Sequence, residues 1–157
     1  MSRTPVRLHI NGHRYDLEVE PHRTLLSVLH QELGLTGTKQ NCLEAECGVC
    51  TLLVDGEAVN SCIYPVMKAE GRQVTTIEGL ATKAGLHPMQ RAFIAYDAVQ
   101  CGYCIPGMIM SAVALVTEHP KPTEQEIVDG LAGNLCRCTG YAKIIEAVSA
   151  AAEEMRG

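Results

Sequence analysis

The eight cysteines of this 157-residue chain are the side chains whose type and spacing point most directly to chemistry. They fall into two groups of four with none left over, here called the first and second cysteine sets. Four thiolates are the ligands of a structural zinc ion or of an iron–sulfur cluster. The first set has the spacing C-x4-C-x2-C-x11-C and the second has C-x2-C-x31-C-x-C, which places them at Cys42, Cys47, Cys50 and Cys62, and at Cys101, Cys104, Cys136 and Cys138.

The spacing of the first set favours a [2Fe–2S] cluster. C-x4-C-x2-C with a distant fourth cysteine is the plant-type ferredoxin pattern, whereas structural zinc usually combines two C-x2-C units, and this set has only one. Gly48 suits the tight backbone turn that lets three neighbouring thiolates converge. A zinc site or buried free cysteines are the alternatives for this set.

The spacing of the second set is less diagnostic, because it is compatible with zinc as well as with iron and sulfur. A redox-active C-x-x-C dithiol would leave Cys136 and Cys138 unexplained. Disulfides are rare in a reducing cytosol, so structural disulfides are a disfavoured explanation of the eight cysteines. If both sets hold clusters, the chain contains two redox centres and carries electrons.

Composition limits the partners and the compartment. The formal charge is −5 before any metal-bound thiolate is counted, which disfavours nucleic acid and anionic membranes as partners. The first residues show neither an apolar leader nor a twin-arginine pair, and the longest uncharged apolar run, Ile105 to Thr117, is too short to span a bilayer. We therefore expect a cytoplasmic protein that makes no membrane contact.

The first half carries the pattern of two β-hairpins around one helix. Apolar and polar residues alternate on both sides of Asn11-Gly12 and of Asp55-Gly56, and both dipeptides are strong hairpin turns. Gly34 stands where a glycine commonly ends a helix. We expect strands at 6–10, 15–19, 51–54, 57–59 and 74–77, and a helix that begins after Thr24 and runs through Leu33.

From about Pro88 the apolar residues recur with the period of a helix. Four short helices are expected, one of them introduced by a capping box of Thr123 and Glu126, with the second cysteine set near their ends. The fold class expected is therefore α+β. Residues 1–77 would form a β-grasp, plant-type ferredoxin-like domain, residues 78–157 a four-helix bundle domain, and residues 76–86 the linker.

The residues around the cysteines resemble the iron–sulfur subunit of the molybdenum hydroxylases, the xanthine dehydrogenase and aldehyde oxidoreductase family. The resemblance runs from about Val6 to Ala151. Four segments carry it: Gly37-Thr-Lys-Gln, Glu46-Cys-Gly-Val-Cys-Thr, Gln100-Cys-Gly-Tyr-Cys-Ile-Pro-Gly-Met and Gly133-Asn-Leu-Cys-Arg-Cys-Thr-Gly-Tyr.

This resemblance implies two [2Fe–2S] clusters, the first near a flavin and the second near molybdenum. Gln100 and Cys138 match residues that contact the molybdopterin. Electrons would pass between molybdopterin, held by a large partner subunit, and FAD, held by a medium partner subunit, in a dimer of heterotrimers. The chain has no catalytic motif of its own, so we expect it to be part of an enzyme and not catalytic alone.

Some features leave alternatives open. The family commonly has glycines at the positions of Asn41, Leu43 and Ala45, which predicts a slightly different loop shape here. Without the adjoining cysteine motif, Gln100 would be read as a polar residue at a helix end. A free-standing two-cluster ferredoxin-like carrier and a structural adaptor with two zinc ions are the alternative functions.

Overall fold

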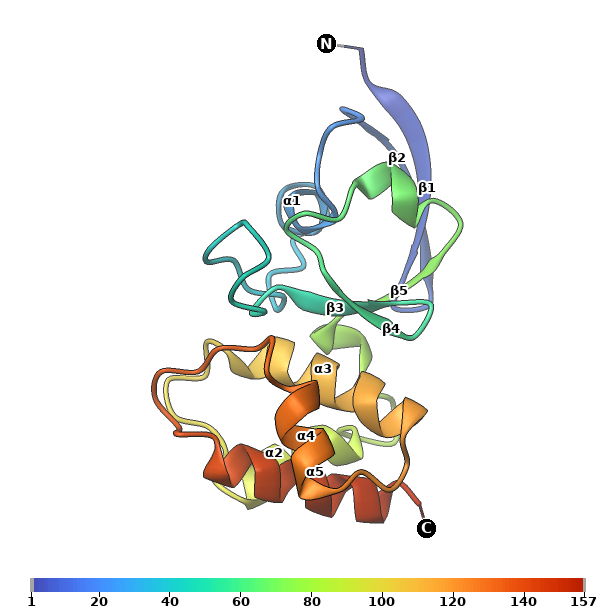
Figure 1. Cartoon of the computed structure of the whole chain (residues 1–157). Helices are drawn as coiled ribbons and strands as arrows, with labels where there is room; N and C mark the ends of the chain where they lie inside the picture. Colours follow the sequence, from blue (N-terminus) through green and yellow to red (C-terminus); the bar gives the residue numbers. More distant parts are fainter. Residues whose placement is uncertain (1, 157) are drawn as a thin grey trace.

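The computed structural model describes residues 2–156 as two lobes stacked end to end, with the chain termini at opposite ends (Figure 1). The first lobe contains a five-stranded sheet, and the second contains four helices. The elements are β1 Thr4–Ile10, β2 His13–Val19, α1 Leu25–Gln31, β3 Thr51–Val54, β4 Glu57–Asn60, the short 3-10 helix η1 Val66–Ala69, β5 Gln73–Thr75, the 3-10 helix η2 Ile77–Gly79, α2 Pro88–Ala95, α3 Ile105–Glu118, α4 Glu124–Gly130 and α5 Ala142–Glu154.

The sheet is mixed, with the strand order β2-β1-β5-β3-β4. β5 runs parallel to β1 and antiparallel to β3, so it joins the two predicted hairpins into one sheet. Both hairpin turns are confirmed, because Asn11-Gly12 and Asp55-Gly56 have positive φ at both residues. α1 and η1 pack against one face of the sheet around a buried aliphatic core of Leu8, Ile10, Leu25, Leu29, Leu52 and Val74.

Two elements end earlier than predicted, β5 because of a contact with a residue distant in sequence and α1 because of a nearby glycine. β5 ends at Thr75 instead of residue 77, because the Thr76 N–H donates to Asn11 Oδ1 at 2.9 Å instead of continuing the ladder. α1 ends at Gln31 instead of Leu33. Gly34 follows at φ 67°, and the next N–H donates back to Leu29 O at 2.9 Å, which is a glycine-dependent helix stop.

In the second lobe, α2 packs against α3 and α5, and α4 packs against the same two helices. Phe93, Met108, Ile127 and Ile144 are fully buried between them. The capping box at the start of α4 is confirmed, since the Thr123 hydroxyl and the Glu126 side chain each accept the other residue's backbone N–H. The predicted linker is partly packed, because it contains η2 and the buried Leu80.

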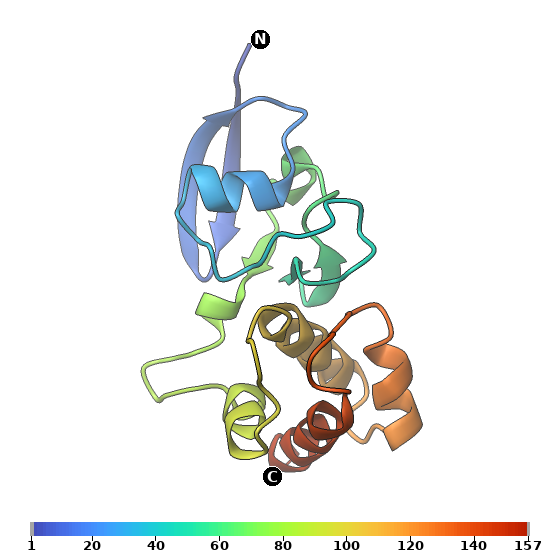
Figure 2. The same ribbon diagram turned by 90° about the vertical axis from the view of Figure 1, so that its left-hand side faces the viewer.

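β3 joins the lobes, because both of its faces are buried. Leu52 and Val54 belong to the core of the sheet, whereas Leu53 packs into the helical core against α3. Figure 2 shows α3 lying directly beneath the sheet. The cysteine-bearing loops therefore meet on one side of the molecule, near the boundary between the lobes (Figures 1 and 2). No helix within residues 2–156 is long and apolar enough to cross a membrane.

Candidate metal centres

Residues 38–50, here called the first loop, connect α1 to β3 and contain three of the four cysteines of the first set. Three of its residues have left-handed backbone angles: Leu43 at φ 64°, Ala45 at 65° and Gly48 at 68°. Successive turns of this kind curl the chain and direct N–H groups toward the concave side. The conformation costs a non-glycine residue about 1–2 kcal/mol. Leu43 and Ala45 therefore curl the loop without being glycine, and the loop stores strain at both residues.

The thiols of the first set contact one another in two pairs, Cys42 with Cys47 and Cys50 with Cys62. Hydrogen bonds lower the pKa of the Cys42 thiol to about 7. The largest contribution comes from the Glu44 N–H, and smaller ones come from the thiol and the N–H of Cys47. Burial raises the pKa of Cys50 to about 11. The loop thus supplies hydrogen-bond donors to a charged Cys42 sulfur at one end, while the buried Cys50 thiol at the other end needs a cation beside it to ionise.

Two side chains outside the first loop hold it in shape. Asn60 on β4 donates from Nδ2 to Ala45 O at 3.2 Å, and its Oδ1 lies 3.9 Å from the Cys50 sulfur. His30 on α1 lies with Nε2 at 2.6 Å from Thr38 O. A carbonyl only accepts, so Nε2 is the protonated nitrogen. The sequence identified neither residue, because both act through contacts that only the fold creates.

The second set comes from two separate segments. Cys101 and Cys104 precede α3, and Cys104 is the residue directly before its first turn. Cys136 and Cys138 lie in the segment 132–141 that joins α4 to α5, here called the second loop. The contacts again form two pairs, Cys104 with Cys136 and Cys101 with Cys138. Each pair therefore joins one cysteine from before α3 to one from the second loop.

Hydrogen bonds fix Cys136 within the second loop. Its sulfur accepts from the Thr139 hydroxyl at 3.0 Å and from the Thr139 N–H at 3.5 Å. Burial raises the pKa of Cys136, but these donors outweigh burial and lower it overall. The Tyr141 hydroxyl accepts the Cys136 N–H at 2.7 Å and donates to Asn134 O at 3.1 Å. Tyr141 therefore ties the backbone on both sides of Leu135 to the start of α5.

The remaining thiols of the second set differ in exposure. Burial raises the pKa of Cys104 to about 12, so its charged form also needs a neighbouring cation. Cys101 and Cys138 are exposed, as is Gln100 beside them. All four thiols line a hollow of about 260 Å³ that also reaches Cys47 of the first set. The structure thus brings the two sets together at one boundary, with the second set nearer the surface.

The pairing of thiols bears on the kind of metal centre. Among residues 2–156, no three His, Cys, Asp or Glu side chains converge as the ligands of one ion do. Each set instead forms two hydrogen-bonded pairs of thiols, and the two pairs lie close enough to influence each other's charge. A [2Fe–2S] cluster has two irons that share four thiolates, whereas structural zinc gathers four ligands around one ion. The donor sets therefore fit a dinuclear cluster better than zinc.

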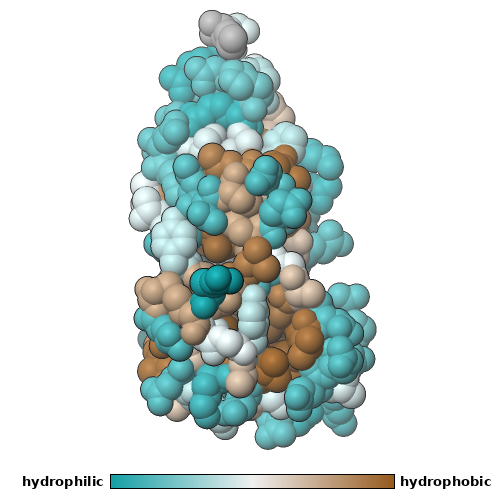
Figure 3. Space-filling view, turned by 60° about the vertical axis from the view of Figure 1, so that its left-hand side comes forward, coloured by the Kyte–Doolittle hydropathy of each residue, from teal (hydrophilic) through white to brown (hydrophobic). Residues whose placement is uncertain are grey.

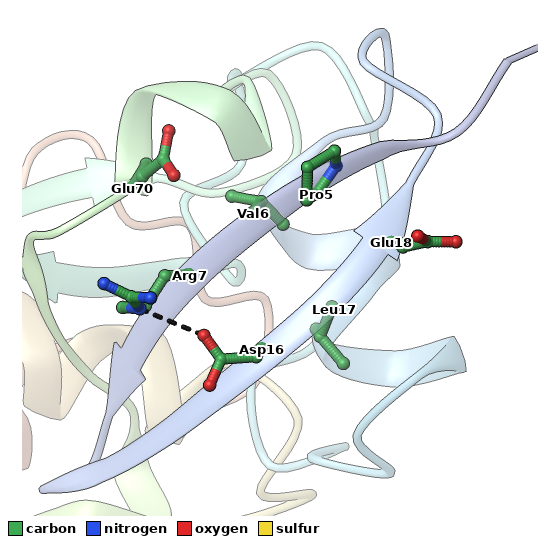
Figure 4. Close-up of a pocket in the computed structure, with 7 residues that line it drawn as sticks. All are labelled: Pro5, Val6, Arg7, Asp16, Leu17, Glu18 and Glu70. Atoms are coloured by element: carbon green, nitrogen blue, oxygen red, sulfur yellow. Dashed lines mark hydrogen bonds and ion pairs between the residues drawn. The ribbon is translucent and has the colours of Figure 1, made fainter.

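Another hollow, of about 350 Å³, lies along β1 and β2 (Figure 4). Arg7 crosses it to pair with Asp16 at 3.0 Å. Hydrogen bonds from Arg14 and from Arg7 lower the pKa of Asp16, which keeps this exposed pair charged. No thiol lines this hollow, and the ion pair of Arg7 with Asp16 spans two neighbouring strands of the sheet.

Comparisons with known proteins agree with this geometry. Residues 8–81 match the family described as 2Fe-2S iron-sulfur cluster binding domain, and residues 76–149 match the family described as [2Fe-2S] binding domain. The chain is 42% identical to the nicotinate dehydrogenase small FeS subunit of Eubacterium barkeri, over 98% of both chains. It is 43% identical to the nicotine 6-hydroxylase small subunit of Paenarthrobacter nicotinovorans, over 93% of this chain and 88% of that one.

Solved structures show the same relationship. The quinoline 2-oxidoreductase of Pseudomonas putida 86 contains a chain that matches with a TM-score of 0.94 and 39% identity, over 99% of this chain and 98% of that one. The aldehyde oxidoreductase of Desulfovibrio gigas matches with a TM-score of 0.93 and 39% identity, over 98% of this chain but only 17% of that longer one. The chain belongs to the iron–sulfur small subunits of the molybdenum hydroxylases, the xanthine dehydrogenase and aldehyde oxidoreductase family.

Proposed function

We propose that this chain is the electron-transfer subunit of a molybdenum- and flavin-dependent oxidoreductase and has no substrate site of its own. The observation that carries the proposal is the two sets of four free thiols, each arranged as two contacting pairs. A bound [2Fe–2S] cluster takes up and releases one electron. The chain's own residues hold the cluster, donate hydrogen bonds to its thiolates and keep water away from them.

We assign Cys42, Cys47, Cys50 and Cys62 as ligands of the first cluster, and Cys101, Cys104, Cys136 and Cys138 as ligands of the second. The curled first loop supports the first assignment, because its N–H groups reach the Cys42 sulfur. The two donors from Thr139 support the second, because hydrogen bonds to the sulfur stabilise a thiolate.

We divide the chain into a β-grasp, plant-type ferredoxin-like domain at residues 1–77 and a four-helix bundle domain at residues 78–157. The sheet with α1 on one face supports the first domain, and the mutual packing of α2 to α5 supports the second. Each domain contains one complete cysteine set, so each has a metal centre of its own.

The surface near the second set supports contact with a large subunit that holds molybdopterin. Gln100 and Cys138 are both exposed; Cys138 lines the hollow of the second set, and Gln100 directly precedes Cys101, which also lines it. Tyr103 and Leu135 add exposed apolar surface beside them. Apolar surface is present near the lobe boundary on the face shown in Figure 3. We propose that Gln100 hydrogen-bonds the pterin and that Cys138 is the ligand nearest to it.

The surface near the first set supports contact with a medium subunit that holds FAD. Leu43 directly follows Cys42 and is 51% exposed, and Ile63 directly follows Cys62 and is 57% exposed. Large apolar side chains next to metal ligands are costly to leave in water, and contiguous exposed apolar surface commonly marks a binding site. Each cluster would then have its own partner surface.

The charge and the cysteines fit such an assembly. A net charge of −5 supports neither nucleic acid nor an anionic membrane as a partner. The eight free cysteines favour a reducing compartment, which we take to be the cytoplasm. We propose a dimer of heterotrimers, in which each heterotrimer combines this chain with the large and medium subunits.

The test begins with metal content and spectra. Material purified without oxygen should contain about four iron atoms and four labile sulfides per chain. The reduced protein should give two distinct EPR signals, because the two thiol environments differ. Zinc without visible colour, or a single EPR signal from fully iron-loaded protein, would contradict the two-cluster assignment.

Partner binding is tested by copurification and by Gln100→Ala. The native chain should copurify with a large and a medium subunit, whereas a free-standing carrier would purify alone. The variant should keep both EPR signals but lose electron flow from the molybdenum side. Gln125→Ala, which changes an exposed glutamine on α4, is the control and should behave as the parent. Loss of iron from Gln100→Ala would contradict a pterin-contact role.

A further inference from the structure

The side chain of Asn134 is buried, with 5% exposure, between the first loop and α3. Its Nδ2 donates to Gly48 O at 2.9 Å and lies 3.4 Å from Thr51 Oγ1. Its Oδ1 accepts the Ser111 hydroxyl of α3 at 2.7 Å. One amide thus connects the first loop, the second loop and α3.

The backbones around this amide are in direct contact. A Cβ atom added to Gly48 would lie 2.2 Å from Gly133 O, and one added to Gly107 of α3 would lie 2.4 Å from Gly48 O. Both distances are far below any real carbon–oxygen contact, so only glycine fits at either position. No side chain separates the three segments, and their spacing is fixed by the backbone and by Asn134.

The residue after Asn134 connects the two cysteine sets. The Leu135 N–H donates to Cys47 O at 2.9 Å, and Leu135 is bonded directly to Cys136. One hydrogen bond and a few covalent bonds therefore join a first-set cysteine to a second-set cysteine. Cys47 is buried, so this connection runs through the interior of the protein.

We propose that Asn134 is a positioning residue that sets the rate of electron exchange between the two metal centres, by holding the Cys47 carbonyl against the Leu135 N–H. This inference rests on the proposed function. Each exchange moves one electron, which oxidises one reduced cluster and reduces the other, and no bond or proton changes place. Such transfer slows steeply as the centres separate or as the path between them gains a gap.

The test uses the full chain with both clusters assembled, and compares Ser111→Ala and Asn134→Ala with the parent. Ser111→Ala removes only the hydroxyl that orients Asn134, and Ser111 lies away from every cysteine in sequence. Ser149→Ala, which changes an exposed serine on α5, is the matched control. If Asn134→Ala fails to assemble, Ser111→Ala decides the outcome.

Two measurements report on the connection that the hydrogen bond from Leu135 to Cys47 makes between the two cysteine sets. Hydrogen exchange of the Leu135 N–H should accelerate about tenfold in Ser111→Ala, which corresponds to about 1.4 kcal/mol, and more in Asn134→Ala. EPR of the fully reduced chain should show weaker magnetic interaction between the two clusters, while each cluster keeps its own signal.

The inference is overturned if both variants hold full iron yet match Ser149→Ala in Leu135 exchange and in magnetic interaction. Failure of the proposed function looks different, because the parent itself would then lack two clusters. A merely structural role for Asn134 would lower the unfolding midpoint and leave the interaction between the clusters unchanged.

Discussion

Gly48 and Gly34 form a natural pair for testing how closely the two lobes are joined. Both have left-handed backbones, at φ 68° and 67°. A Cβ atom at Gly34 would have nothing within 4 Å, whereas one at Gly48 would lie 2.2 Å from Gly133 O and 2.8 Å from Asn134 Nδ2. Replacing each glycine by alanine therefore adds the same backbone strain, and only Gly48→Ala adds a clash.

The magnitude follows from what the clash must displace. The left-handed conformation costs alanine about 1–2 kcal/mol at both sites. At Gly48 the methyl group meets a carbonyl that cannot rotate away, so the loops must move apart. That movement breaks the bond from Asn134 to Gly48 O and the bond from Leu135 to Cys47 O. At about 1 kcal/mol for each bond, Gly48→Ala should be about 2 kcal/mol less stable than Gly34→Ala.

The assay is urea unfolding of the parent and both variants without metal, followed by circular dichroism. With a slope of about 2 kcal/mol per molar urea, a difference of about 2 kcal/mol moves the midpoint by about 1 M. Iron binding by the refolded proteins is the second measurement, and Gly34→Ala should bind as the parent does. Equal midpoints for the two variants would refute the idea that direct backbone contact holds the loops together.

Three further predictions use other contacts. Leu43→Gly should raise the free energy of unfolding by about 0.5 kcal/mol, because it relieves left-handed strain and removes a half-exposed side chain; a lower thermal midpoint would contradict this. Burial lowers the pKa of His87, and the positive charge of Arg91 lowers it further. The Nδ1 atom of His87 caps α2 by accepting the Met89 N–H. As the pH falls, the unfolded chain therefore binds a proton at His87 before the folded chain does. The free energy of unfolding should then fall as the pH drops below about 6.5 and level off below the pKa of His87 in the folded chain. His87→Asn should flatten this profile in urea midpoints measured across that range, and an unchanged profile would point to another group. Tyr103→Phe removes the hydroxyl that donates to Gln40 O. It should lower stability by about 1 kcal/mol without loss of iron, whereas Tyr96→Phe should have no effect in the same unfolding assay.

Local chemistry made much of the first lobe predictable. Asn-Gly and Asp-Gly fixed the hairpins because both central residues of such turns need positive φ. The cysteine spacing predicted two sets of four thiols, and the structure brings the thiols of each set together. Their role as cluster ligands stays a prediction. The capping box of Thr123 likewise marked the start of α4 from residues three positions apart.

The rest depends on residues distant in sequence. The end of β5 is decided by Asn11, which follows the neighbouring strand β1 and accepts the N–H of Thr76, 65 residues away in the sequence. Asn134 lies inside a segment that the sequence singled out for its cysteines, yet its partner Gly48 is 86 residues away. The consecutive apolar residues of β3 indicate that both of its faces are buried, but nothing local indicates that α3 covers the second face.

The position of β5 between β1 and β3 has a consequence for biosynthesis. As the nascent chain leaves the ribosome, the sheet cannot close until residue 75 has emerged, and by then the whole first set is already outside. The second loop, which later covers Cys47, emerges much nearer the end of translation. The topology therefore allows the first lobe to fold around its cysteine set before the second loop packs over Cys47.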